Sequence, residues 1–317
     1  MVGAVPLRRG MPGSEAPPEP IAAGLSEARA LCAALTRRHG ENFTVLSLLA
    51  PRALRTHLAV VYAYCRAVDD LGDEGHLPRE LCDRECRAIP PGAERLELLD
   101  RFERELDLAY EGHPTSPLFV ALAATIREFD LPREPFARLI EANRIDQERK
   151  RYATYSDLLY YCEHSATPVG RLVLGLYRVR DAESERLSDA TCTALQLANF
   201  WQDVKRDLAM GRIYLPQEDL ARFGVAETDL AEEQGSGAFR QLMQFEVERT
   251  RALFAEGLPL VGRVSGHLRV DLALFSRGGL AVLNKIERQG YDTIARRPSL
   301  SRAEKGWIFL AAVAGKR

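Results

Sequence analysis

The chain has 317 residues, of which 46% are hydrophobic, and this is enough apolar material for a sizeable core in a single large domain. Its formal net charge is −2, from 43 Lys and Arg against 45 Asp and Glu, so charge gives no basis for nucleic-acid binding. The six cysteines lack zinc or C-x-x-C spacing, and no run of about 18 apolar residues is present, so we expect reduced thiols, no membrane-spanning helix and a cytoplasmic location.

The N-terminal segment is predicted to be a disordered tail. Met1–Pro20 contains five prolines and three glycines and shows no hydrophobic periodicity. From residue 21 onward the pattern is helical nearly throughout, with prolines at helix-sized intervals. Strand-like alternation is limited to the short segment RIYL at residues 212–215. We therefore predict an all-α protein with a tail (residues 1–20) and one large helical domain (residues 21–317).

The first helix with chemical content is predicted at Arg52–Asp73, after the start signal Pro51. Most of its circumference is apolar, which is typical of a buried helix. A narrow stripe on the remaining face carries polar side chains, namely Tyr62, Arg66, Asp69 and Asp73. The two acids, four residues apart, are therefore expected to point into an internal cavity.

A polar and small-residue run follows Tyr161, with the sequence YCEHSATPVG at residues 161–170. Its proline and glycine are expected to break or kink a helix beside the cavity. Aromatic residues are the candidate walls of this cavity, because a cavity in which a reaction generates a carbocation needs dry, aromatic surroundings. The candidates are Phe43, Tyr62, Tyr64, Tyr160, Tyr161, Phe200 and Trp201.

A second acid-bearing helix is predicted at Ser188–Met210, ending at Gly211. Its polar stripe consists of Gln196, Asn199, Asp203 and Asp207, and the rest of the helix is largely apolar. Buried carboxylates are costly unless they are paired or bind a metal. Two such pairs on two apolar helices predict helices that face each other across one cavity.

Four hard oxygen ligands in a cavity are suited to Mg²⁺, which completes its shell with water and substrate phosphate. Arginine forks match phosphate oxygens, and Arg66, Arg171 and Arg212 are the candidates. An acid-bound Mg²⁺ with convergent arginines can withdraw diphosphate from an allylic carbon, since the metal neutralises the leaving charge. The alternative interpretation is two solvated acidic helix faces with ordinary surface arginines.

The chain resembles the squalene/phytoene synthase family, the synthases that join two prenyl chains head to head. The resemblance rests on YAYCRAVDDLGDE (residues 62–74), YCEHSATPVG (161–170) and QLANFWQDVKRDLAMGRIYLP (196–216). It implies an isoprenoid synthase fold with a central cavity, Mg²⁺ and diphosphates held by the two DxxxD motifs, and a catalytic role for Tyr161. The implied metal-binding residues are Asp69, Asp73, Asn199, Asp203 and Asp207, and the implied substrate- or diphosphate-binding residues are Asn42, Phe43, Tyr62, Arg66, Arg171, Gln196, Asn199, Gln202, Arg212 and Tyr214.

Three departures from the common family pattern narrow the functional hypothesis. The chain has ENF at residues 41–43, SATPVG at 165–170, and Gln202 before Asp203. These features look like the bacterial hydroxysqualene synthase branch, which ionises presqualene diphosphate and captures the rearranged cation with water on the route to squalene and hopanoids. A condensing synthase that makes presqualene diphosphate, squalene or phytoene is one alternative, and a non-catalytic assembly partner is another.

The implied cofactor is Mg²⁺, as more than one ion with diphosphate, and no NADPH is expected. The expected partner is a prenyl diphosphate substrate. We also expect transient association with the inner face of a membrane or with a presqualene diphosphate synthase.

Overall fold

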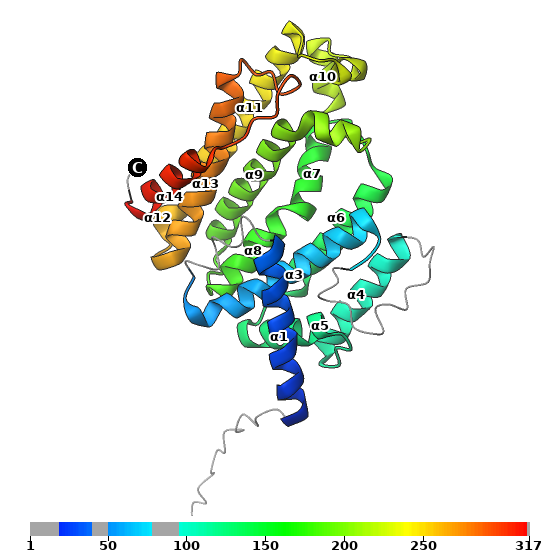
Figure 1. The fold of residues 1–317 in the computed structure, drawn as a ribbon, viewed down its shortest axis with the longest axis vertical. Coiled ribbons are helices and arrows are strands. Elements are labelled where there is room, and N and C mark those ends of the chain that lie inside the picture. The colour runs from blue at the N-terminus through cyan, green and yellow to red at the C-terminus, as the bar shows by residue number, and fades with distance from the viewer. Residues whose placement is uncertain (1–18, 40–49, 78–94, 316–317) are drawn as a thin grey trace, which may run out of the picture.

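The computed structural model describes residues 19–39, 50–77 and 95–315, and these residues form helices joined by short connections (Figure 1). No strand is present within those ranges, so the all-α prediction is confirmed there. The predicted tail lies outside them, apart from Glu19 and Pro20, which already belong to the first helix. None of the described helices combines the length and hydropathy needed to cross a membrane.

The elements follow in chain order. They are α1 (Glu19–His39), α3 (Arg52–Glu74), α4 (Arg95–Glu111), α5 (Pro117–Phe129), α6 (Arg133–Glu148), α7 (Tyr155–Ser165), α8 (Thr167–Leu176), α9 (Ala182–Ala209), α10 (Gln217–Phe223), the 3₁₀ helix η2 (Glu227–Ala231), α11 (Gly237–Gly257), α12 (Leu260–Arg263), α13 (Gly266–Arg288) and α14 (Arg302–Val313).

The two acid-bearing helices are close to their predicted positions. Helix α3 begins after Pro51 as predicted and ends at Glu74, where Gly75 adopts a left-handed conformation (φ 73°) that leaves the helix. Helix α9 begins at Ala182, six residues before the predicted start, because the Asp181 side chain caps it by accepting from the Ser184 amide. The segment at residues 212–215 forms no strand.

The core consists of two apolar clusters, and the acid-bearing helices belong to different ones. The first cluster unites side chains of α1, α3, α4, α5 and α8 around the buried Tyr64. The second unites α7, α9, α11 and α13 around the buried Trp201. Helix α6 contributes Phe136 and Ile140 to the first cluster and Ala142 to the second. In Figure 1, α9, α11 and α13 accordingly lie beside one another, with α1, α4 and α5 at the other end of the molecule.

A close approach of α3 and α6 joins these two parts near the first acid pair. A Cβ atom on Gly72 would lie 2.1 Å from Asn143 Oδ1, so a glycine is needed between Asp69 and Asp73. Gln147 Nε2 donates to the Gly72 carbonyl at 3.0 Å. The glycine of the DDLGDE motif thus allows α6 to place its polar side chains against the acids of α3.

Candidate functional site

The first acid pair lies at the C-terminal end of α3, on the exposed side of an otherwise buried helix. Asn143 Nδ2 on α6 donates to Asp69 Oδ1 at 3.4 Å, and Arg212 Nη2 lies 2.8 Å from Asp73 Oδ1. Asp69 is exposed to water on one side, and the protein atoms around its other side desolvate the carboxyl and raise the pKa of Asp69 to about 7, with a further contribution from the charge of Asp73.

The predicted role of Arg66 is not what its contacts favour. Its guanidinium forms an ion pair with Asp70, which is buried, and lies 4.0 Å from Glu74 Oε1. Both partners belong to α3 itself. They lie four and eight residues after Arg66, a spacing that places side chains along one face of a helix. In this structure Arg66 therefore neutralises Asp70 and does not contact Asp69 or Asp73.

The second acid pair lies on α9, where the helix is kinked at Asp203 (φ −108°, ψ 15°). Arg297, from the segment between α13 and α14, donates through Nε and Nη2 to the two Asp203 oxygens, the latter at 2.9 Å. Asp207 is buried, and desolvation together with the charge of Asp203 raises the pKa of Asp207 to about 7. The second pair thus consists of one carboxylate in a guanidinium fork and one that is poorly compensated.

Arg212 connects the two pairs. The chain reverses after α9 at Gly211 (φ 76°), and the Arg212 amide donates to the Asp207 carbonyl at 2.9 Å. This turn directs the Arg212 side chain, which is 13% exposed, toward Asp73 of α3. The carboxylates of Asp146 and Asp73 raise the pKa of Arg212 despite its burial. Arg212 therefore carries its charge among the acids of three helices.

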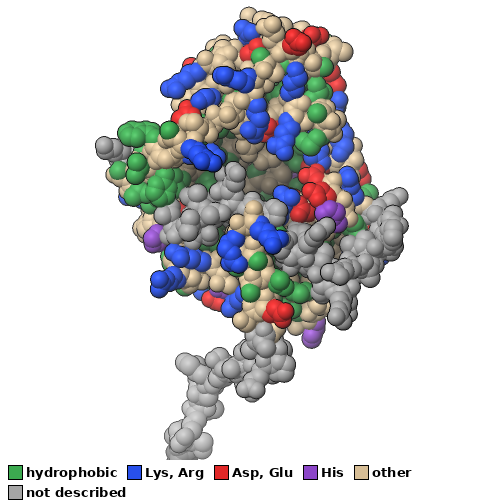
Figure 2. All heavy atoms as spheres, in the orientation of Figure 1, with side chains coloured by type: hydrophobic (Ala, Val, Ile, Leu, Met, Phe, Trp, Pro, Cys, Tyr) green, Lys and Arg blue, Asp and Glu red, His purple; other side chains and the backbone are tan. Residues whose placement is uncertain are grey.

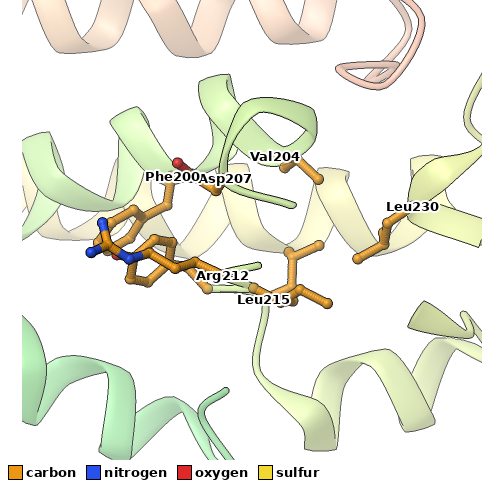
Figure 3. Close-up of a pocket in the computed structure, with 8 residues that line it drawn as sticks. Phe200, Val204, Asp207, Arg212, Leu215 and Leu230 are labelled. Carbon is orange, nitrogen blue, oxygen red and sulfur yellow. The ribbon is translucent and has the colours of Figure 1, made fainter. Parts of the chain in front are cut away.

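A small pocket is lined in part by this arginine (Figure 3). Asp207 and Arg212 form its polar end, and its remaining lining is apolar or aromatic, namely Phe200, Val204, Ile213, Tyr214, Leu215 and Leu230. On the surface view, a hollow with Lys and Arg side chains on its rim and acidic side chains at one side opens near the middle of the molecule (Figure 2). Asp207 and Arg212 thus border a pocket that is otherwise apolar, but its volume of about 10 Å³ has no room for a hydrocarbon chain in this conformation.

Helix α6 supplies a polar face that the sequence reasoning missed. Asn143, Asp146 and Gln147 lie on one side of it, and Asp146 Oδ2 accepts a 2.7 Å hydrogen bond from the Tyr161 hydroxyl. The other Asp146 oxygen is buried without a hydrogen-bond partner among the described residues. Their spacing of three and four residues was a usable signal, but the helix lacks the paired acids that drew attention to α3 and α9.

Tyr161 belongs to a cluster of four aromatic rings. The rings of Phe200 and Tyr214 stack at 3.8 Å with an interplanar angle of 10°, and Tyr161 lies 5.8 Å from Tyr214 and 6.2 Å from Phe200. Tyr152, which sequence reasoning did not select, lies 5.6 Å from Tyr161 and 5.7 Å from Tyr214. Burial raises the pKa of Tyr161 well above its usual range, so its hydroxyl stays protonated and donates to Asp146.

Three other aromatic candidates have structural positions. Tyr64 is fully buried and donates to the Phe136 carbonyl at 2.9 Å, and Trp201 is fully buried and donates to Thr250 Oγ1 at 2.8 Å. Tyr160 is 48% exposed and packs on His164. Tyr64 and Trp201 are thus core side chains and Tyr160 is a surface one, and none of the three lines the pocket beside Arg212.

Two predicted binding residues point elsewhere. Arg171 on α8 forms two hydrogen bonds with Asp189 on α9, at 2.7 and 3.2 Å, and these hold the two helices together. Gln202 is buried and donates through Nε2 to the Pro298 carbonyl. Their contacts therefore do not favour a direct role in diphosphate binding.

The remaining predicted site residues are placed less sharply. Tyr62 and Gln196 are half-buried, and Asn199 is exposed one turn before Asp203. Asn42 and Phe43 lie outside the described residues.

The donor set has the chemistry of a Mg²⁺ site that is completed by substrate. Among the described residues no three His, Cys, Asp or Glu side chains converge closely enough to hold a metal ion by themselves. Mg²⁺ commonly takes only one or two carboxylates and fills its shell with water and phosphate oxygens. The elevated pKa values of Asp69 and Asp207 show carboxylates whose charge the protein leaves poorly compensated, and a cation would compensate it.

Comparison with known proteins gives one consistent family. The profile described as squalene/phytoene synthase matches residues 36–304. A 15-cis-phytoene synthase of Synechococcus elongatus is 31% identical over 88% of this chain and 90% of its own. The crystal structure of squalene synthase HpnC from Alicyclobacillus acidocaldarius is 47% identical, covers 85% of this chain and 96% of its own, and has a TM-score of 0.77. A dehydrosqualene synthase structure with bound ligand is 26% identical, covers 93% of this chain and 98% of its own, and has a TM-score of 0.79.

Proposed function

The chain belongs to the squalene/phytoene synthase family, and we propose that within it this protein acts as a hydroxysqualene synthase. The substrate is presqualene diphosphate, whose carbon–oxygen bond to diphosphate ionises. The cyclopropylcarbinyl cation then rearranges and takes the oxygen of a water molecule, which loses a proton to give the alcohol. The products are hydroxysqualene and diphosphate, on a route to squalene and hopanoids.

The 47% identity to squalene synthase HpnC across 85% of the chain supports a reaction on the route to squalene, and the choice of hydroxysqualene within that route rests on the motif variants named below. The phytoene synthase relatives are 28–32% identical over a similar share. The motif variants ENF, SATPVG and NFWQD point in the same direction. The proposal therefore gives more weight to squalene synthase HpnC, which has the higher sequence identity, than to the phytoene synthases, which are more numerous.

The charged residues divide the work of diphosphate departure. Asp69, Asp73, Asp203 and Asp207 would hold Mg²⁺, which when bound supplies Lewis-acid neutralisation of the leaving group. Arg212 lies 2.8 Å from Asp73 and can turn its fork to phosphate oxygens, because a guanidinium matches them bidentately.

The aromatic cluster serves the cation. The rings of Tyr161, Tyr214 and Phe200 lie together, and the π faces of aromatic rings attract a positive charge. Asp146 fixes the orientation of the Tyr161 ring because its carboxylate accepts a hydrogen bond from the Tyr161 hydroxyl. Tyr161 therefore stays neutral and rigid while charge develops nearby.

A condensing activity is the second candidate, and the phytoene synthases among the relatives favour it. The purified protein is incubated with Mg²⁺ and, separately, with presqualene, farnesyl or geranylgeranyl diphosphate, and the products are identified by mass spectrometry. In ¹⁸O-labelled water without NADPH, presqualene diphosphate is expected to give an alcohol that carries the label. A hydrocarbon as sole product, or an unlabelled alcohol, contradicts the proposal, and phytoene from geranylgeranyl diphosphate supports the alternative.

A further inference from the structure

The last helix, α14, exposes large apolar side chains. Seven large hydrophobic residues are exposed in the described part of the chain, and four of them are on this helix of twelve residues. Their exposed fractions are 68% for Trp307, 62% for Leu310, 54% for Val313 and 38% for Phe309. A cluster of this kind is unusual on a soluble surface, because each exposed apolar side chain forgoes the free energy of burial.

These four residues form one face, and the opposite face holds the helix in place. At about 100° per residue they share the outward half of α14 with Ala303, Gly306 and Arg302. The inner side carries the buried Ala312 and Glu304, whose carboxylate binds Lys285 Nζ of α13 at 2.8 Å. Ser301 and Glu304 also form a capping box that fixes the start of the helix. The apolar face is therefore held outward and takes no part in the core.

The surrounding segment is cationic although the chain as a whole is slightly acidic. Residues 266–315 contain eight Lys and Arg against four Asp and Glu, whereas the full chain has 43 against 45. Asp271 is buried, and Glu287, Asp292 and Glu304 form ion pairs with Arg251, Arg240 and Lys285. Figure 2 shows the apolar patch at one edge of the molecule with basic side chains beside it. Lys285 and Arg297 are themselves paired with Glu304 and Asp203, and it is the basic side chains beside the patch in Figure 2 that make its surroundings complementary to an anionic surface.

From this combination we infer that α14 is a membrane-docking helix that lies in the plane of an anionic lipid surface. Trp, Phe and Leu on one face with basic residues alongside are the features of helices that insert their apolar side into the headgroup boundary. The inference rests in part on the proposed function, since the substrate carries a long hydrocarbon chain and the product is an apolar alcohol that water does not dissolve.

The same C-terminal segment reaches the candidate site. Arg297 binds Asp203 and the Pro298 carbonyl accepts from Gln202, and α14 begins only five residues after Arg297. A docked α14 would therefore connect the second acid pair to the lipid surface through a segment that spans at most about 17 Å.

The test is flotation of the full chain with vesicles of phosphatidylcholine alone or of equal parts phosphatidylcholine and phosphatidylglycerol. The unaltered protein is expected to float with the anionic vesicles and to dissociate as salt rises. The double variant Trp307→Ser/Leu310→Ser is expected to bind at least about tenfold more weakly, because two anchors are lost. Met210→Ser, which changes a 53% exposed residue at the end of α9, is the matched control and keeps full binding.

Two outcomes overturn the inference. One is absence of flotation of the unaltered protein with anionic vesicles. The other is equal binding by the double variant, provided that its thermal unfolding matches that of the unaltered chain. If sedimentation instead shows a dimer that the double variant abolishes, with no vesicle binding, the face is a contact between two copies. Turnover of detergent-dispersed presqualene diphosphate tests the proposed function separately, since the double variant keeps that turnover.

Discussion

The helices α3 and α9 carry the same acid spacing, but the protein treats their carboxylates differently. On α3, Asp69 faces a neutral amide of Asn143, and Asp73 meets Arg212. On α9, the helix is kinked at Asp203. Arg297, from the segment between α13 and α14, donates two hydrogen bonds to that carboxylate. Asp207 is buried with a raised pKa. Each pair therefore has one carboxylate bound by an arginine from a distant segment, whereas the other carboxylate has a neutral amide partner on α3 and is buried on α9.

This difference teaches that identical motifs need not be equivalent half-sites. A carboxylate beside an amide can accept a cation without displacing a charge, whereas one in a guanidinium fork must first lose its partner. In the proposed function, a cation at Asp203 would compete with Arg297 of the segment that leads to α14, and a cation at Asp73 would compete with Arg212 of the turn after α9, whereas Asp69 would bind it without displacing a charge.

The largest expected effect comes from removing one charge in each half. Asp69→Asn and Asp203→Asn should each lower turnover by roughly a thousandfold or more, because an amide contributes no charge to a Mg²⁺–diphosphate cluster. Their thermal unfolding should differ. Asp69→Asn removes a poorly compensated charge, so its melting temperature should be unchanged or raised. Asp203→Asn weakens the ion pair with Arg297, so its melting temperature should be lowered. Near-normal rates at saturating substrate in either variant would show that the two-cluster site is wrong.

The next largest effect on turnover concerns Tyr161. This residue is on α7, and its ring lies beside Phe200 of α9. Tyr161→Phe keeps the π face, and Tyr161→Ala removes it, so Ala should lose about 30-fold more rate if the ring contributes about 2 kcal/mol to the cation. Ala should also yield more misquenched alcohols. Truncating a buried aromatic costs roughly 3–5 kcal/mol of stability, so unfolding curves of both variants are the control. Equal rates for Phe and Ala would leave only a hydroxyl role, through Asp146.

A smaller effect separates the two arginines. Arg297→Met should tighten Mg²⁺ binding a few-fold, because it frees Asp203 from a partly exposed ion pair worth about 0–1 kcal/mol. Arg212→Met should also destabilise the metal-free protein, because Asp73, Asp146 and Asp207 lose a shared buried cation. Calorimetric titration with Mg²⁺ and melting curves with and without the ion measure both. If Mg²⁺ raised the two melting temperatures equally, the halves would be equivalent.

The last effect concerns the stability of the fold and leaves turnover aside, and it uses a buried acid outside both pairs. Burial raises the pKa of Asp271 to about 7, and the Tyr177 hydroxyl counteracts this only in part. Because the folded state holds a proton that the unfolded state releases near its usual range, stability should fall as pH rises from about 4 to about 7 and level off above that. Asp271→Asn mimics the protonated acid and should flatten this part of the profile, by up to about 4 kcal/mol. Urea unfolding at several pH values checks it, and an unchanged slope contradicts it.

Much of the fold could be read from the sequence. The apolar circumference of residues 52–73 and the cap signals around it located α3 within one residue at its C-terminal end. The start of α9 was missed because Asp181 caps a turn that carries no strong apolar periodicity. Aromatic roles could not be assigned, since Tyr64 and Trp201 follow the same helical spacing as Tyr161 and Phe200.

The sequence by itself determined the helical class and the two acid pairs, because helix periodicity and i,i+4 stacking are local properties of the chain. Tertiary structure alone decided the partners. Asp146 reaches Tyr161, Arg297 reaches Asp203, and Arg212 reaches Asp73 across 15, 94 and 139 residues of chain. Such pairings depend on how the helices pack, and packing arises from the sum of many weak apolar contacts that no single motif encodes.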